Sequence, residues 1–279
     1  MKTNEASFGK AEKLLLNSLV LAVLVAPGMV MAAEVPVPAP APEPASPHTF
    51  TANVGFTTDY VFRGISQTST NPAVQGGIDY SHSSGLYAGI WGSNVSWIAD
   101  SGAVALGSVT MELDTYFGIR NSFAKDFTYD FGFIRYNYLG NYTANVAGGF
   151  AKADTNEVYA AIGYKWVTAK YSYGLDDFLT VPGARGTDYF EINANIPVAD
   201  TGITIGAHAG KQKYKGAAAA AFANTPTYTD YKLSISKDFS GYVIGVAYTD
   251  TNASPFYTYP AFGGDWGQGT GVLFVTHSF

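Results

Sequence analysis

The sequence contains no cysteine among its 279 residues. This absence excludes a disulfide framework, a lipid-modified N-terminal cysteine, a thiol nucleophile, and zinc or iron–sulfur sites with cysteine ligands. Charged residues make up only 14% of the chain, well below the roughly 25% of typical soluble domains. The net charge is −6 with only 16 basic residues, a composition that disfavours a nucleic-acid-binding protein.

The chain also lacks an apolar run long enough for a transmembrane helix, which needs about 20 residues. Aromatic residues and glycine are abundant instead, at 15% of the chain and 31 glycines respectively. Few charges together with many aromatics and glycines argue against a disordered chain and against a coiled coil.

The first 32 residues have the three-part layout of a secretory signal peptide. Three lysines precede an apolar run at 14–26, Pro27 and Gly28 end the run, and Ala32 and Ala33 provide a cleavage-like site. The alternative is an N-terminal anchor helix, which the short run disfavours. We therefore expect residues 1–32 to be removed during export, with cleavage after Ala32 or Ala33.

Residues 33–48 are rich in proline, with six prolines between positions 36 and 47. Alternating prolines favour an extended polyproline II conformation and cannot continue a helix or a sheet. We expect this segment to be a stiff periplasmic spacer between the cleavage site and the folded domain.

Residues 49–279 alternate between apolar and polar side chains with a period of two, which is typical of β-strands with one apolar face. Phe190 and Ile192, for example, alternate with Glu191 and Asn193. The pattern predicts twelve strands, near 49–63, 72–82, 84–97, 110–122, 126–138, 155–166, 167–177, 186–197, 201–214, 228–238, 240–251 and 268–279.

The connections between these strands alternate between short and long, which is typical of an outer-membrane barrel with short periplasmic turns and long outer loops. A β-sandwich or a lipocalin-like barrel would not require this alternation. The sequence therefore predicts an all-β fold, a transmembrane antiparallel up-and-down β-barrel of about twelve strands in the bacterial outer membrane. The terminal aromatic Phe279 resembles the sorting signal of such proteins.

Residues 50–97 carry a distinctive pattern that resembles the TorF family of bacterial porin-type proteins. The resemblance implies an outer-membrane barrel with channel activity, and it implies no particular solute. Downstream, Glu112 and Asp114 fit an acidic pair of that family. The matching residues are Asp59, Tyr60, Phe62, Arg63, Gly64, Ser66, Gln67, Pro72, Gln75, Gly76, Gly77, Asp79, Tyr80, Gly85, Tyr87, Gly89, Trp91, Ser93 and Asn94.

Charged side chains on the polar face of the strands would point into the barrel lumen, where they meet water or one another. Acids outnumber bases in this set, which favours cations in an open channel. The alternative is a plugged, non-conducting barrel that serves a structural or binding role through its outer loops. The lumen candidates are Asp59, Arg63, Asp79, Glu112, Asp114, Arg120, Asp130, Glu157, Glu191 and Lys232, joined by Lys165, Lys170 and Asp230.

The segment from Asp59 to Gln67 is the most distinctive part of the chain. Asp59 and Arg63 lie four residues apart on one face of a predicted strand, with Arg63 near the outer rim. We expect them to pair either with each other or across strands. Such pairs would either fix the strand register and the first outer loop or form a constriction or loop-anchoring site. The aromatic loop 252–267 is expected to fold in and narrow the mouth, so that its deletion would raise conductance.

We find no pattern that indicates catalysis, a cofactor or a metal site. The four histidines are scattered without ligand spacing, and no His–Ser pair suggests a barrel lipase. The expected partners are membrane lipid, the outer-membrane assembly machinery and small diffusing solutes, without nucleic acid. The sequence gives no oligomeric state.

Overall fold

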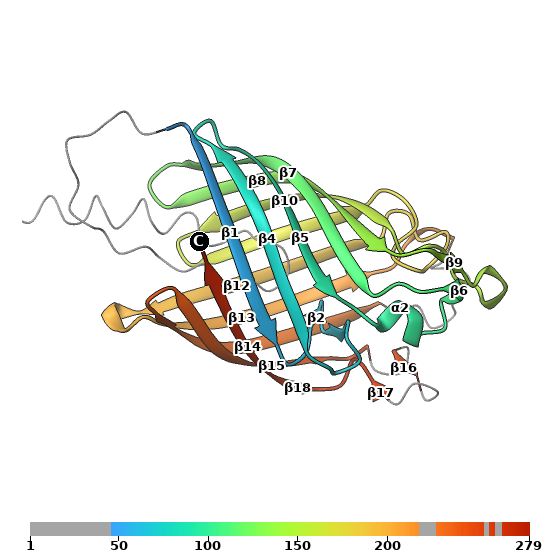
Figure 1. Cartoon of the computed structure of the whole chain (residues 1–279). Helices are drawn as coiled ribbons and strands as arrows, with labels where there is room; N and C mark the ends of the chain where they lie inside the picture. The colour runs from blue at the N-terminus through green and yellow to red at the C-terminus, as the bar shows by residue number, and fades with distance from the viewer. Residues whose placement is uncertain (1–45, 218–226, 254–256, 260–263) are drawn as a thin grey trace, which may run out of the picture.

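The computed structural model describes residues 46–217, 227–253, 257–259 and 264–279. The predicted signal peptide and nearly all of the spacer lie outside these ranges, so both stay predictions. The main body is a closed barrel of twelve antiparallel strands (Figure 1), which confirms the predicted fold class. Its strands are β1 (His48–Thr57), β4 (Ala73–His82), β5 (Leu86–Asn94), β7 (Met111–Phe123), β8 (Phe127–Leu139), β10 (Thr155–Tyr164), β11 (Val167–Gly174), β12 (Asp188–Val198), β13 (Ile203–Lys213), β14 (Tyr228–Phe239), β15 (Tyr242–Thr251) and β18 (Thr270–Ser278).

Each strand pairs with its neighbours in the chain, and the barrel closes where β1 pairs with β18. The closing register places Asn53 opposite Ser278 and Thr57 opposite Phe274. Closure leaves no open sheet edge, so the backbone N–H and C=O groups of the wall are paired within the sheet.

The outer face of the wall is apolar, as the period of two predicts. Large hydrophobic side chains point outward from every strand and stay exposed, such as Phe50 (71%), Ile90 (45%) and Leu233 (64%). The alternate positions carry polar, small or tyrosine side chains, many of which are buried inside the barrel. This arrangement suits a barrel with lipid outside and polar groups within.

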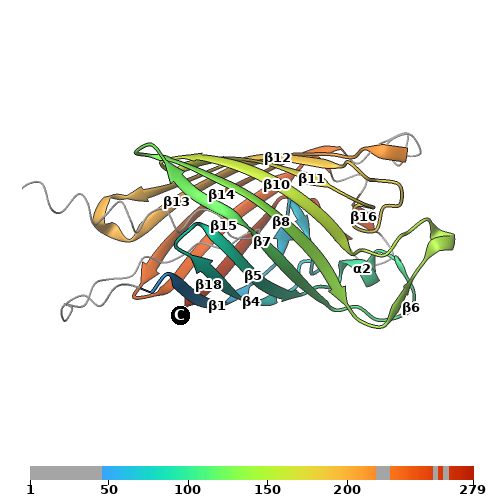
Figure 2. The same ribbon diagram turned by 90° about the horizontal axis from the view of Figure 1, so that it is seen from above.

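The two ends of the barrel differ in the length of their connections. At one end, which we call the turn end, short turns join strand pairs, for example around Lys165, which adopts a positive φ of 51°. At the other, the loop end, long connections carry α2 (Trp97–Asp100), the paired β6 (Val104–Gly107) and β9 (Tyr142–Ala144), and the paired β16 (Thr258–Tyr259) and β17 (Gly264–Asp265). Figure 2 again places α2 and β6 together at this end.

Within the described ranges, two connections contain 3₁₀ turns, η2 (Val146–Gly148) at the loop end and η3 (Ala199–Thr201) between β12 and β13. Each helix in the described ranges is too short or too polar to cross a bilayer.

The first strand ends six residues earlier than predicted, at Thr57 rather than at residue 63. The chain then turns and forms a small hairpin, β2 (Val61–Phe62) and β3 (Ile65–Ser66). Arg63 and Gly64 make its two-residue turn with positive φ angles of 46° and 78°, the combination that a type I′ hairpin turn requires. We call residues 58–68 the lumen hairpin, because its side chains contact the inner faces of several barrel strands.

Candidate functional site

The lumen hairpin reaches across the barrel toward strands far from β1. A Cβ atom on Gly64 would lie 2.6 Å from the Cβ of Asp230 on β14 and 3.0 Å from the Cβ of Thr251 on β15. The backbone at the hairpin tip is therefore pressed against this wall, and glycine alone fits there at a positive φ. The carbonyl of Trp266 accepts a hydrogen bond of 2.9 Å from the Ser66 amide, so the last long loop also contacts the hairpin.

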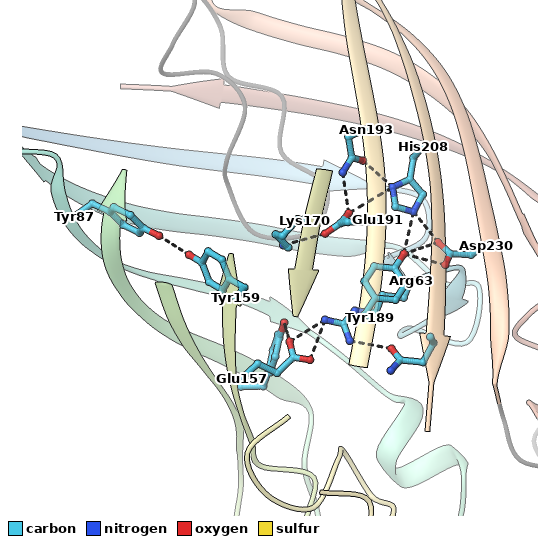
Figure 3. Close-up of polar contacts among 12 residues, drawn as sticks. Arg63, Tyr87, Glu157, Tyr159, Lys170, Tyr189, Glu191, Asn193, His208 and Asp230 are labelled. Carbon is cyan, nitrogen blue, oxygen red and sulfur yellow. Dashed lines mark hydrogen bonds and ion pairs between the residues drawn. The ribbon is translucent and has the colours of Figure 1, made fainter. Parts of the chain in front are cut away.

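Arg63 at the hairpin tip forms a buried ion pair with Glu157 of β10. Its Nη2 donates to both carboxylate oxygens of Glu157, at 2.8 and 3.1 Å, and its Nη1 donates to Oε1 of Gln212 on β13 at 2.9 Å (Figure 3). The side chains of Arg63 and Glu157 are only 6% and 1% exposed. The guanidinium also lies 4.3 Å from the ring centre of Tyr189. These contacts join the hairpin to β10, β12 and β13.

Of the two pairings that the sequence left open for Asp59 and Arg63, the structure shows the one across strands, since Arg63 binds Glu157 and not Asp59. Asp59 lies where the chain has left the wall, and its Oδ1 accepts hydrogen bonds from Ser66 (2.6 Å) and Thr68 (3.1 Å). Burial raises the pKa of the Asp59 carboxyl, and these two hydroxyls oppose the rise. Asp59 thus holds the base of the hairpin together, while Arg63 binds an acid across the barrel.

The hairpin covers two acids of β7. The hydroxyl of Tyr60 donates to Glu112 at 2.8 Å, and its ring packs edge-on against Trp91. Asp114 is fully buried beside them, and among the described residues neither of its carboxylate oxygens has a hydrogen-bond partner. The predicted acids Glu112 and Asp114 do face the lumen, but the hairpin closes them off from water.

Several tyrosines lie against the inner wall of the barrel instead of pointing across the lumen. Tyr116 on β7 crosses Gly89 on β5, and its hydroxyl donates to Asp79 on β4 at 2.7 Å. A Cβ on that glycine would lie 2.6 Å from the tyrosine ring, so only glycine leaves room for it. The acid, the glycine and the tyrosine therefore come from three neighbouring strands.

The same arrangement occurs twice more. Tyr87 crosses Gly118 and donates to Asp130 at 2.7 Å. Tyr189 crosses Gly210 and donates to Asp230 at 2.9 and 3.0 Å. The hydroxyl of Tyr87 also meets that of Tyr159 at 2.5 Å, as Figure 3 shows. Each tyrosine provides a hydrogen-bond donor to a lumen acid without placing its ring in the middle of the lumen.

The contact between Tyr189 and Gly210 requires glycine at position 210, and a substitution tests this requirement. Replacing Gly210 with alanine should displace the Tyr189 ring, which overlaps the position of the new Cβ, and break its bond to Asp230. Overpacking of this kind costs about 1–3 kcal/mol. We expect the free energy of unfolding, measured by urea titration in lipid vesicles, to fall by this amount. Gly271→Ala is the matched control, because its new Cβ would meet nothing within 4 Å; equal losses in the two variants would contradict the account.

A mixed-charge cluster lies on β11 to β14. Lys170 pairs with Glu191 at 3.0 Å, and Nε2 of His208 lies 2.8 Å from Asp230. Asn193 donates to Glu191 at 2.9 Å, which links the cluster further. Lys232, another predicted lumen residue, interacts electrostatically with Glu191 and Asp230.

Most of the predicted lumen residues face the barrel interior. Asp130 and Glu157 are each 1% exposed, and Arg120 lies over the ring of Tyr87 at 4.6 Å. Lys165 is an exception, because it sits exposed in the turn between β10 and β11. Without it, acids still outnumber bases in the set that faces the lumen.

The lumen-facing tyrosines and Gln212 were not among the residues predicted from the sequence. Tyr87 and Tyr189 fall on the lumen-facing parity of their strands and are 5% and 2% exposed. Glycines at the same parity on neighbouring strands, such as Gly118, were a signal that could have identified them. Gln212 gave no local signal, because its partner Arg63 is 149 residues away in the chain.

In the part of the chain that the structure describes, no group of three or more His, Asp or Glu side chains is placed to hold a metal ion. His208 is bonded to Asn193 and Asp230 and belongs to the mixed-charge cluster.

The sequence of the barrel matches the model of a known protein family. A family model described as a bacterial protein of unknown function, Gcw_chp, matches residues 41–279. The chain belongs to the Gcw_chp family. The Gcw_chp match covers every barrel strand and the lumen hairpin, and it leaves the resemblance to TorF porins untested. A search among curated proteins found no match.

Several solved structures are similar to this Gcw_chp barrel. A KdgM porin in complex with disordered oligogalacturonate is 10% identical with a TM-score of 0.48, over 83% of this chain and 99% of that chain. The outer membrane protein Omp33 of Acinetobacter baumannii is 8% identical with a TM-score of 0.43, over 83% and 97%. OccD3 (OpdP) of Pseudomonas aeruginosa is 13% identical with a TM-score of 0.40, over 85% of this chain and 66% of that chain. Likenesses at this level carry no information on solute or mechanism.

Proposed function

We propose that this protein is a porin-like channel of the bacterial outer membrane that passes small polar or ionic solutes and prefers cations, and that it is a TorF-type porin. The lumen hairpin narrows its outer half. No reaction and no cofactor are part of this proposal. The observation that carries it is the combination of an apolar outer wall with an acid-rich interior whose tyrosines lie flat.

Membrane insertion is supported by the exposed apolar side chains on successive strands, such as Phe117 (58%), Phe131 (55%) and Ile162 (51%). An apolar surface that runs around a closed barrel is far larger than the isolated patches that soluble proteins expose. Lipid is the partner that such a surface fits, and the short turns then face the periplasm.

A water-filled turn half is supported by the tyrosine–glycine contacts of Tyr116 and Tyr87, because rings that lie along the wall leave the centre of the lumen free. Charged groups such as Lys170 and Glu191 remain 26% and 15% exposed there. The outer half is different, since the lumen hairpin and its aromatic neighbours project into it. Passage of solute is therefore limited at the hairpin.

The proposed cation preference is tested by neutralising acids of the turn half. Asp79→Asn together with Asp130→Asn keeps hydrogen-bond acceptors for Tyr116 and Tyr87 but removes two negative charges. In a planar bilayer with a salt gradient, we expect the reversal potential of the wild type on the cation side and that of the double variant closer to zero. Asp250→Asn is the control, because this carboxylate is exposed on the outer surface. An anion-side potential in the wild type would refute the preference.

A second candidate is a plugged barrel that does not conduct. The burial of Arg63 between Glu157 and Gln212 favours this plugged barrel. These contacts hold the hairpin in the lumen, so that it blocks the passage. Reconstitution separates the two functions. Discrete current steps support the channel, whereas a silent bilayer, with the folded barrel verified by heat-dependent gel mobility, supports the plug.

A further inference from the structure

A cavity of about 290 Å³ lies at the loop end beside the lumen hairpin. The hairpin contributes Phe62 and Ile65, the connection between β11 and β12 contributes Phe178 and Val181, and Trp97 and Trp266 complete the wall. The volume corresponds to roughly ten water molecules. It is near the lower end of the range of small-molecule sites, which are concave and mostly apolar.

The lining differs from the rest of the barrel interior because its described residues include no charged side chain. Among its polar groups, the buried indole N–H of Trp97 has no hydrogen-bond partner in the described part of the chain, and the hydroxyls of Tyr214 and Tyr257 lie 3.2 Å apart. Its two glutamine amides are engaged elsewhere. Nε2 of Gln67 donates to the Ile65 carbonyl at 2.9 Å, and Nε2 of Gln212 donates to the Asp188 carbonyl at 3.0 Å. An ion in this cavity would lose its hydration without gaining a counter-charge, and a sugar would leave most of its hydroxyls without partners.

We propose that this cavity binds a small, neutral compound with a single aromatic ring and at most one or two polar groups. Aromatic walls match such a ring through edge-to-face and offset contacts, and the scarcity of available polar groups selects against charged and polyhydroxylated molecules. The cavity shares Phe62 and Phe178 with the Arg63 site, where the guanidinium lies 4.8 and 5.6 Å from their ring centres. A bound ring would therefore pack on Phe62 and Phe178, which also contact Arg63 at the tip of the lumen hairpin.

The test is ligand binding to the folded barrel in detergent micelles, followed by fluorine NMR. The probes share one ring and differ in charge: 4-fluorobenzyl alcohol, 4-fluorobenzylammonium and 4-fluorobenzoate, with a fluorinated glucose as the sugar. We expect saturable line broadening with the alcohol alone. Val181→Trp fills the cavity and should weaken this binding at least tenfold, whereas Val146→Trp, at a 75% exposed position in an outer loop, should leave it unchanged.

Three outcomes would overturn the proposal. The alcohol signal could match that of protein-free micelles, the charged probes or the sugar could bind as well as the alcohol, or Val181→Trp could bind like wild type. Heat-dependent gel mobility verifies that each variant is folded. The measurement requires no conduction, so a silent bilayer would leave this proposal standing, and an empty cavity would leave the channel standing.

Discussion

Replacing Arg63 with alanine is expected to release the lumen hairpin and raise the ion current through the barrel. The change leaves Glu157 as a buried carboxylate without its counter-charge, and it removes the bond to Gln212. Breaking a buried ion pair in this way costs about 3–5 kcal/mol. We expect the free energy of unfolding to fall by this order and the single-channel conductance to rise, measured by urea titration and in planar bilayers respectively.

The structure offers a control for the loss of an arginine. Arg135 and Asp154 lie 3.7 Å apart at the loop end, with side chains 40% and 31% exposed. Exposed pairs contribute about 0–1 kcal/mol, so Arg135→Ala should change stability little and conductance not at all. A second variant, Arg63→Ala with Glu157→Gln, should recover part of the lost stability while keeping the higher current. If Arg63→Ala conducts as the wild type does, the ion pair does not hold the constriction.

Shortening the hairpin has the largest expected effect on conduction. Replacing residues 60–66 with a short glycine–serine link removes Tyr60, Phe62, Arg63 and Ile65, whose side chains are all buried. The acids that they cover, Glu112, Asp114 and Glu157, then face water. We expect a larger conductance together with a stronger cation preference, because the three side chains that become exposed to water are all acids.

The wall of the barrel could be predicted from the sequence because each strand repeats a local pattern. Alternation such as Phe190, Glu191, Ile192 and Asn193 indicates which face meets lipid, and the short turns indicate which strands pair. Each of the twelve predicted strands corresponds to one barrel strand, with ends that shift by a few residues except in β1.

The hairpin could not be predicted in this way. Apolar residues continue at Tyr60 and Phe62 in phase with Phe56, so the alternation gives no sign that the strand ends at Thr57. What draws the chain inward is contact with Glu112 on β7, 52 residues along the chain from Tyr60, and with Glu157, 94 residues from Arg63. A local pattern carries no information about partners at that separation, although the Arg63–Gly64 turn was a weak local sign.

The acids on the lumen-facing parity of the strands can be listed from the sequence, but their hydrogen-bond partners cannot. Period two places Asp79, Asp130 and Asp230 on the inner face, and each then receives a tyrosine hydroxyl from two strands away. Finding that donor requires knowing that a glycine lies between, which depends on the register of three strands. This register is set by the pairing of the strands in the closed barrel and cannot be read from any one strand.

The central claim is that the lumen hairpin sets the width of a conducting, cation-preferring passage. It is tested most directly by recording single-channel currents of the wild type and the hairpin-shortened barrel side by side in the same salt gradient. We expect small cation-side steps for the wild type and clearly larger cation-side steps for the shortened barrel. Equal conductance in the two proteins, or silence in both with folding verified, would contradict it.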